Sequence, residues 1–173
     1  MPTKHRGIQK LRRRIAGVKK IIFKLVEQKY VYQEDAEAEH YHAEVFAVRC
    51  FDNRYWKQFK HFIKDRGMGH IDTESVAGGA KIFASPEKDS DSDFMLRELQ
   101  KSELLHHTKK VMLFTHSDCG AYGGLTRFNG DKDAEFLFHT DELHKATGVV
   151  CDKFSHLKVE AYFMNQGGIV RIP

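Results

Sequence analysis

A histidine and a cysteine three residues apart mark the place in this 173-residue chain where metal chemistry is best supported. Residues 115–124 read THSDCGAYGG and directly follow the apolar run Val111–Phe114. The imidazole of His116 and the thiolate of Cys119 are both ligands that zinc accepts. Two ligands do not complete a zinc site, and Asp118 is the only other candidate nearby. Further ligands must therefore come from elsewhere in the chain.

A second polar cluster follows another short apolar run. The run 45–49 (VFAVR) predicts a buried strand, and the cluster Cys50-Phe51-Asp52-Asn53-Arg54 comes directly after it. Sites in open α/β sheets form at the carboxyl ends of strands, so Cys50, His116 and Cys119 converge if the two strands are neighbours. The 66-residue gap between Cys50 and His116 excludes a zinc finger. Three protein ligands leave a fourth position for water, which is the pattern of a catalytic zinc site.

The chain has three cysteines, which are Cys50, Cys119 and Cys151. An odd, small number argues against a disulfide framework and leaves metal binding or catalysis as the sharper interpretations. For a cysteine taken singly, the favoured interpretation is a small buried apolar residue. Cys151 has no partner motif, and we predict that it is such a residue.

Charge is distributed unevenly along the chain. Residues 1–29 hold ten basic side chains and one acidic side chain, a net charge of +9, whereas the rest holds 18 basic and 23 acidic side chains, a net charge of −5. No uncharged apolar run approaches the roughly 20 residues that cross a bilayer, and no secretory signal is recognisable. We expect a soluble, cytoplasmic protein with no membrane partner.

The basic N-terminal stretch predicts an amphipathic helical arm. Its apolar residues recur at spacings of three and four, at Ile8, Leu11, Ile15, Val18, Ile22 and Leu25. The arm could bind RNA or another polyanion, act as an organellar presequence, dock on a neighbouring subunit or cover its own core. Packing within the protein or its oligomer is favoured, because an apolar stripe normally seeks a partner surface. We predict an arm and acidic linker over residues 1–43 and a zinc domain over residues 44–173.

Strands and helices alternate in the predicted domain. Further strands are expected over 70–76, 111–115, 157–164 and 169–172, and helices over 55–66, from Ser92 or Asp93 to His106-His107, and over 133–147. The two histidines are expected to be solvated. This order predicts an α/β fold with a largely parallel central sheet flanked by helices.

The two polar motifs resemble those of the beta-class carbonic anhydrases. Cys50, Asp52 and Arg54 match a C-x-D-x-R motif, and His116, Cys119 and Gly120 match an H-x-x-C-G motif. The resemblance covers roughly residues 44–172 and implies Zn²⁺ held by Cys50, His116 and Cys119. It implies that zinc-bound hydroxide converts carbon dioxide into bicarbonate, with Asp52 orienting the bound water and Arg54 keeping Asp52 off the metal. It also implies a homodimer or larger homo-oligomer.

The chain departs from the family pattern at several positions. Ser75–Gly79 keeps only the Ala-Gly core of the segment usual in the family, and Ser117 and Asp118 alter the second motif. Tyr122, beside Cys119, is expected to reshape the mouth of the pocket. These differences concern the substrate more than zinc binding, so carbonyl sulfide and carbon disulfide are alternative substrates. A further alternative is a non-catalytic zinc protein that binds a polyanion through residues 1–29.

Overall fold

The computed structural model describes residues 30–173, so the predictions for residues 1–29, including the helical arm and its partners, lie outside the described part. The chain divides into two units between Ala38 and Glu39. Residues 30–38 are exposed and form no helix or strand. Every helix and strand described here belongs to residues 39–173. The predicted boundary at residue 43 stays a prediction.

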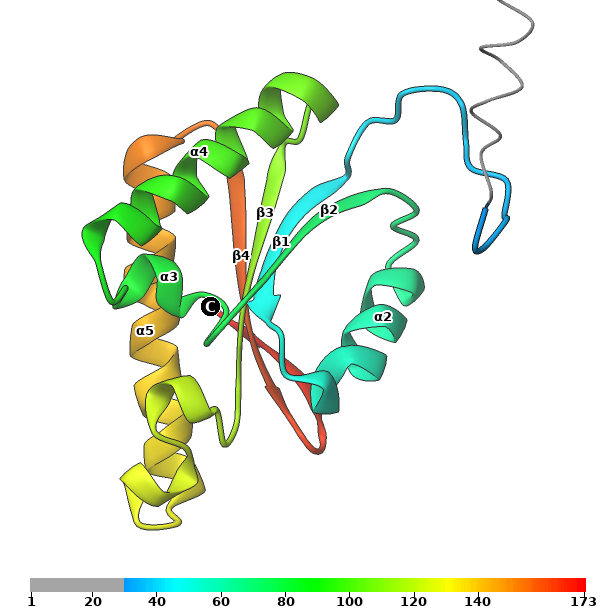
Figure 1. Ribbon diagram of the computed structural model, residues 1–173. Helices are drawn as coiled ribbons and strands as arrows, with labels where there is room; N and C mark the ends of the chain where they lie inside the picture. The colour runs from blue at the N-terminus through cyan, green and yellow to red at the C-terminus, as the bar shows by residue number, and fades with distance from the viewer. Residues whose placement is uncertain (1–29) are drawn as a thin grey trace, which may run out of the picture. The chain divides into compact units, whose positions relative to one another are not determined.

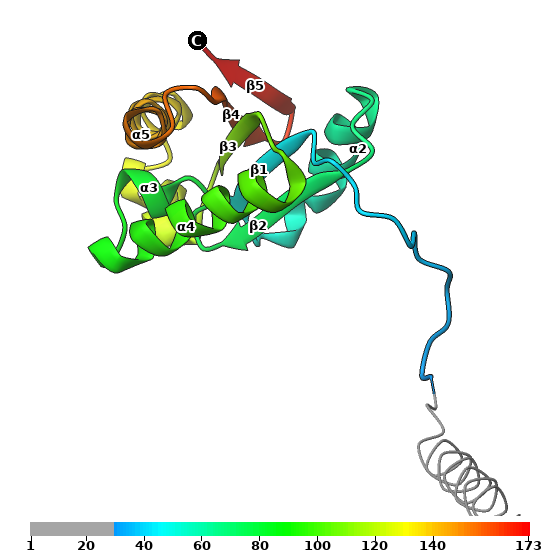
Figure 2. The ribbon, with the colours of Figure 1, turned by 90° about the horizontal axis from the view of Figure 1, so that it is seen from above.

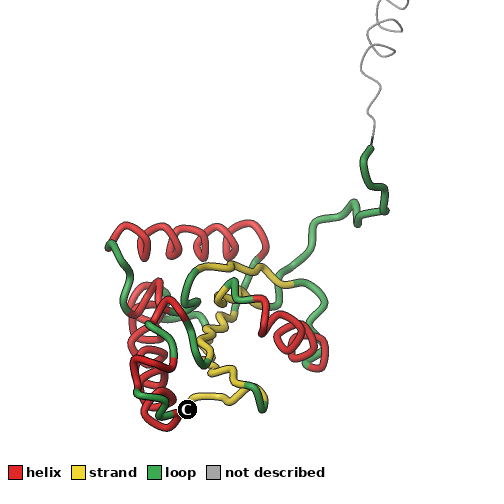
Figure 3. Tube along the Cα trace, turned by 60° about the horizontal axis from the view of Figure 1, so that its bottom comes forward, coloured by secondary structure: helices red, strands yellow, loops and turns green. Residues whose placement is uncertain are grey.

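The centre of this unit is a sheet of five strands. Figure 1 and Figure 3 show the strands lying between the helices. The spatial order of the strands is β2-β1-β3-β4-β5, and the first four strands are parallel while β5 runs antiparallel to β4. The bounds are β1 (Val45–Cys50), β2 (Ile71–Val76), β3 (Lys110–His116), β4 (Lys158–Asn165) and β5 (Gly168–Ile172). The predicted α/β fold with a largely parallel sheet is therefore confirmed.

Helices cover both faces of the sheet. Figure 2 shows α3 (Lys81–Ala84), α4 (Asp89–His106) and α5 (Lys132–Lys153) on one face and α2 (Trp56–Asp65) on the other. Side chains alternate along each strand, so each face has its own core. On β3, Val111 and Leu113 pack with the three-helix side, whereas Met112 and Phe114 pack with α2. Short 3-10 turns, Asn53–Tyr55, Gly120–Tyr122 and Leu125–Phe128, follow β1 and β3.

Two helix boundaries differ from the sequence-based expectation. Helix α4 begins at Asp89 rather than at Ser92 or Asp93, because acidic residues are favoured in a first turn and the Asp91 carboxylate accepts the N–H of Lys88 at 3.2 Å. Helix α5 continues past Gly148 to Lys153. A helical glycine costs only about 1 kcal/mol, and the complete burial of Val150 in the core outweighs it.

Two further expectations need correction. His106 is not simply solvated, because its Nδ1 lies 2.9 Å from the carboxylate of Asp72, whereas His107 is exposed at the end of the helix. Cys151 is partly exposed rather than buried. Among residues 30–173, no helix has both the length and the apolar character needed to span a bilayer.

Candidate metal centre

Strands β1 and β3 end at the same edge of the sheet. They are parallel neighbours, with Phe46 opposite Val111 and Val48 opposite Leu113. Cys50 is the last residue of β1 and His116 is the last residue of β3. The condition on which the predicted convergence depended, that these two strands are adjacent, is therefore met.

Three buried side chains meet at this edge. The Sγ atoms of Cys50 and Cys119 and a ring nitrogen of His116 all lie within 4.8 Å of one another. Among the described residues, this is the one group of three or more histidine, cysteine or acidic side chains close enough to hold a metal ion. The structure thus brings together the three residues that the sequence predicts as ligands.

The ring of His116 is oriented for binding through Nε2. Its Nδ1 lies 2.8 Å from the carbonyl oxygen of Ser117 and donates to it, which leaves Nε2 as the nitrogen with a free lone pair. The ring packs against Tyr55, whose hydroxyl lies 2.7 Å from the Ser117 hydroxyl. Nε2 is buried and has no hydrogen-bond partner within residues 30–173. A buried polar atom without a partner is costly, and a metal ion would satisfy it.

The sulfur atoms of Cys50 and Cys119 lie in hydrogen-bond contact. This contact is the main cause that lowers the pKa of Cys50 to about 4, and the imidazole of His116 and the backbone N–H groups of Asp52 and Gly78 lower it further. The hydrogen bond to Cys50, together with burial, raises the pKa of Cys119. Backbone donors that stabilise a thiolate are typical of metal-binding cysteines.

The turn after β2 closes on the end of β1. Gly79 adopts φ +62°, and a Cβ atom built there would lie 2.3 Å from the carbonyl oxygen of Phe114 and 2.8 Å from the nitrogen of Cys50. Only glycine fits such a close approach of three segments. The Ala-Gly-Gly turn therefore brings the Gly78 N–H to the Cys50 sulfur.

Asp52 and Arg54 form a tight ion pair beside the cluster. Nε of Arg54 lies 3.1 and 3.0 Å from the two carboxylate oxygens of Asp52, and Nη2 lies 2.7 Å from Oδ2. Hydrogen bonds from Arg54 lower the pKa of Asp52 to about 2, so its carboxylate is ionised at neutral pH. Oδ2 of Asp52 is 3.9 Å from Nε2 of His116. The pair therefore faces the nitrogen that would bind a metal.

Asp118 contributes in a way that sequence reasoning missed. It is not a member of the three-residue cluster, and its carboxylate binds Arg54 instead, with Nη1 2.9 Å from Oδ2. The only sign of this role in the sequence is the presence of an acidic residue inside the H-x-x-C-G motif.

Tyr122, which was expected to reshape the mouth of the pocket, is 4% exposed and packs against Phe138 and His139. It clusters with Cys50 and Cys119 and is not among the residues that line the pocket over them.

A pocket of about 560 Å³ opens over the cluster. Its walls include the three clustered residues, the Asp52 and Arg54 pair, and small side chains such as Ala77 and Gly120. Phe51 lines it with a largely exposed ring. The fourth side of a metal held here would therefore face a space large enough for a small substrate.

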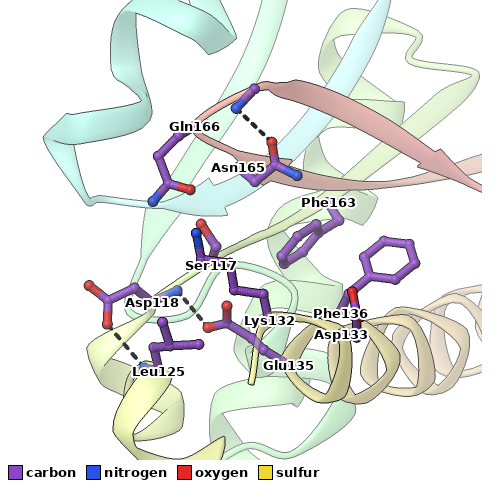
Figure 4. Close-up of a pocket in the computed structure, with 11 residues that line it drawn as sticks. Ser117, Asp118, Leu125, Lys132, Asp133, Glu135, Phe136, Phe163, Asn165 and Gln166 are labelled. Carbon is purple, nitrogen blue, oxygen red and sulfur yellow. Dashed lines mark hydrogen bonds between the residues drawn. The ribbon is translucent and has the colours of Figure 1, made fainter. Parts of the chain in front are cut away.

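A second pocket, of about 410 Å³, shares Asp118 with the first. Figure 4 shows the residues that line this second pocket. Ser117 and Asp118 line it, together with Glu135 of α5 and Asn165 at the end of β4. Glu135 is 1% exposed, and its Oε1 accepts the N–H of Asp118 at 2.6 Å. Sequence reasoning did not identify Glu135.

Comparisons with known proteins agree with this geometry. A family model described as "Putative carbonic anhydrase" matches residues 41–172. Uncharacterized proteins of Rickettsia bellii and Rickettsia conorii are each 24% identical, the first over 131 residues (74% of this chain, 80% of that protein) and the second over 154 residues (84% and 82%). The beta-carbonic anhydrase isoform I of Trichomonas vaginalis has a TM-score of 0.51 at 12% identity, covering 94% of this chain and 96% of that chain. At that identity, the likeness concerns the fold.

Proposed function

Because the chain belongs to the carbonic anhydrase family whose model it matches over residues 41–172, we propose that it is a zinc-dependent enzyme that interconverts carbon dioxide and bicarbonate. The observation that carries the proposal is the buried cluster of Cys50, His116 and Cys119, with Nε2 of His116 lacking a partner and facing Asp52. The likeness in fold to a beta-carbonic anhydrase is consistent with it.

The residues of the cluster fit a zinc ion. Two thiolates and one imidazole are a donor set that zinc favours, and three protein ligands are typical of catalytic sites. The separation of the ligand atoms, within 4.8 Å, is compatible with metal bonds of about 2.0–2.3 Å from a common centre. Zinc held there would supply Lewis acidity and provide a hydroxide nucleophile near neutral pH.

The surrounding residues prepare the site for this reaction. The ionised carboxylate of Asp52 can accept a hydrogen bond from a nucleophile in the pocket and so orient its remaining lone pairs towards carbon dioxide. Arg54 holds that carboxylate in place through Nε and Nη2. The small walls at Ala77 and Gly120 leave room for a linear triatomic substrate.

Metal content tests the centre first. Zinc should bind to the wild-type protein and to Cys151→Ser, a matched control whose cysteine lies outside the cluster, but not to Cys50→Ser. A stopped-flow indicator assay of the zinc-loaded protein then tests the activity between about pH 7 and pH 9, where zinc makes hydroxide available. Hydration no faster than the buffer background would refute the proposal. Sulfide release from carbonyl sulfide or carbon disulfide would indicate the alternative substrates.

A further inference from the structure

We propose that Asp118 is a positioning residue that holds Arg54 against Asp52 and thereby keeps the Asp52 carboxylate away from the metal. The inference rests on the metal centre of the proposed function. It concerns a residue between His116 and Cys119 whose side chain lies outside the predicted ligand set. Its basis is a continuous set of hydrogen bonds from helix α5 to the pocket.

Asp52 holds Arg54 from one side only, through Nε and Nη2. The side chain of Arg54 is 52% exposed, so solvent competes for its remaining N–H donors. Asp118 adds two acceptors on another side of the guanidinium. Its Oδ2 lies 2.9 Å from Nη1, and its carbonyl oxygen lies 2.9 Å from Nη2. Arg54 is therefore bound between two acceptor groups that approach from different segments.

Asp118 is itself fixed in place. It adopts a left-handed backbone conformation with φ +51°, which aspartate tolerates better than most residues. Its N–H donates to Oε1 of Glu135 at 2.6 Å, and its Oδ1 accepts the N–H of Leu125 at 3.0 Å, as the dashed lines in Figure 4 show. Glu135 is almost completely buried on α5. The acceptors that bind Arg54 are thus anchored to the helix layer.

Asp52 lies close enough to the metal position for its restraint to matter. Its Oδ2 is 3.9 Å from Nε2 of His116, the nitrogen that would bind zinc. Carboxylate oxygens are good zinc ligands at about 2.0–2.2 Å. If Arg54 moved into solvent, a small rotation of Asp52 would bring its oxygen into the fourth coordination position. By fixing Arg54, Asp118 keeps that position open to exogenous ligands.

Azide binding to the cobalt-loaded protein tests this role, because azide competes directly for the fourth position and changes the cobalt absorption spectrum. Asp118→Gly removes the carboxylate without backbone strain. Its apparent azide affinity should fall about tenfold if Asp52 then occupies the metal in roughly nine molecules in ten. Asp118→Asn is the graded comparison. Its single amide oxygen can accept from Arg54 or from Leu125 but not from both, so its azide affinity should lie between those of the wild type and Asp118→Gly.

A second background separates positioning from general structure. In Asp52→Asn protein the competing carboxylate is gone, so adding Asp118→Gly should leave azide affinity unchanged. Equal azide affinity in wild type and Asp118→Gly, or a loss that persists in the Asp52→Asn background, would overturn the inference. If Asp118→Gly does not take up cobalt, Asp118→Ser is used in its place, because a serine hydroxyl does not reach Arg54. The azide affinities expected for Asp118→Ser, in both backgrounds, are those given for Asp118→Gly.

The result is independent of the reaction. Wild-type protein that binds no cobalt would refute the metal centre of the proposed function. Cobalt and azide binding with the expected pattern, but without carbon dioxide hydration, would uphold the role of Asp118 and refute the activity. Carbon dioxide hydration together with unchanged azide affinity in Asp118→Gly would uphold the activity and refute the role of Asp118.

Discussion

Substituting Gly79 by alanine should disrupt the metal centre through contacts of the backbone alone. Gly79 lies where the turn after β2 meets the ends of β1 and β3. An added Cβ would lie 2.3 Å from the oxygen of Phe114, 2.8 Å from the nitrogen of Cys50 and 3.0 Å from the carbonyl carbon of Arg49. These are backbone atoms of central strands, so relieving the overlap requires a strand end to move. The two strand ends in contact carry Cys50 and His116.

The magnitude follows from two contributions. Forcing extra atoms into a packed region typically costs about 1–3 kcal/mol. Placing alanine in the left-handed conformation at φ +62° adds about 1–2 kcal/mol. Gly130→Ala is the matched control, because Gly130 has φ +81° and no atom within 4 Å of the added Cβ. It should show the conformational cost alone, so the difference between the variants isolates the overlap.

Urea unfolding of both metal-free variants measures the free energies, and zinc titration measures the effect on the centre. Gly79→Ala should lose about 2–5 kcal/mol of stability and bind zinc more weakly. Gly130→Ala should lose about 1–2 kcal/mol and bind zinc normally. Equal losses in the two variants would show that the close approach at Gly79 carries no energetic weight. Unchanged zinc affinity in Gly79→Ala would show that the turn does not position Cys50.

Two further predictions concern α5. Burial lowers the pKa of His139 to about 4, whereas an exposed imidazole has a pKa near 6.5. The unfolded chain therefore takes up a proton that the folded chain does not as the pH falls from about 6.5 to about 4, so stability falls across this window. In urea unfolding of the metal-free protein, His139→Leu should reduce the loss in free energy of unfolding between about pH 6.5 and pH 4 by roughly 3 kcal/mol. A pH dependence equal to that of the wild type would contradict this. Asp131 caps α5 by accepting the N–H groups of Asp133 and Ala134, so Asp131→Ala should cost about 1 kcal/mol in the same assay, and no loss would show that the cap is dispensable.

The ligand cluster was accessible from the sequence because each of its parts has a local signal. A short apolar run followed by a polar cluster predicts a strand that ends at a site, and this pattern occurs before Cys50 and again before His116. What the runs do not reveal is which strands are neighbours. Strands β1 and β3 are neighbours because β2 lies at the edge of the sheet. The sequence does not show this, so it predicts that Cys50, His116 and Cys119 converge only if the two strands are adjacent.

The residues around the cluster were harder to predict because their roles depend on tertiary contacts. A single acidic residue at position 118 is compatible with a metal ligand, a surface charge or an arginine partner. Only the 2.9 Å contact with Arg54, which is 64 residues away in the sequence, decides between them. Glu135 lies in the first turn of a helix, where acidic residues are common for reasons of helix stability alone. Its burial beneath Asp118 leaves no trace in the local pattern.

Helix α5 links the stability of the core to the geometry of the site. Leu143, Ala146 and Val150 pack α5 into the core with no exposed surface. The same helix presents Glu135 to the N–H of Asp118, and this contact fixes the residue that binds Arg54. A shift of α5 on the sheet would therefore move an acceptor of Arg54 even if every residue of the ligand cluster stayed in place. Substitutions in the core of α5 should consequently alter anion binding at the metal more than equally destabilising substitutions of Met95 or Leu99 in α4, which pack in the same core but do not line the pocket over the cluster.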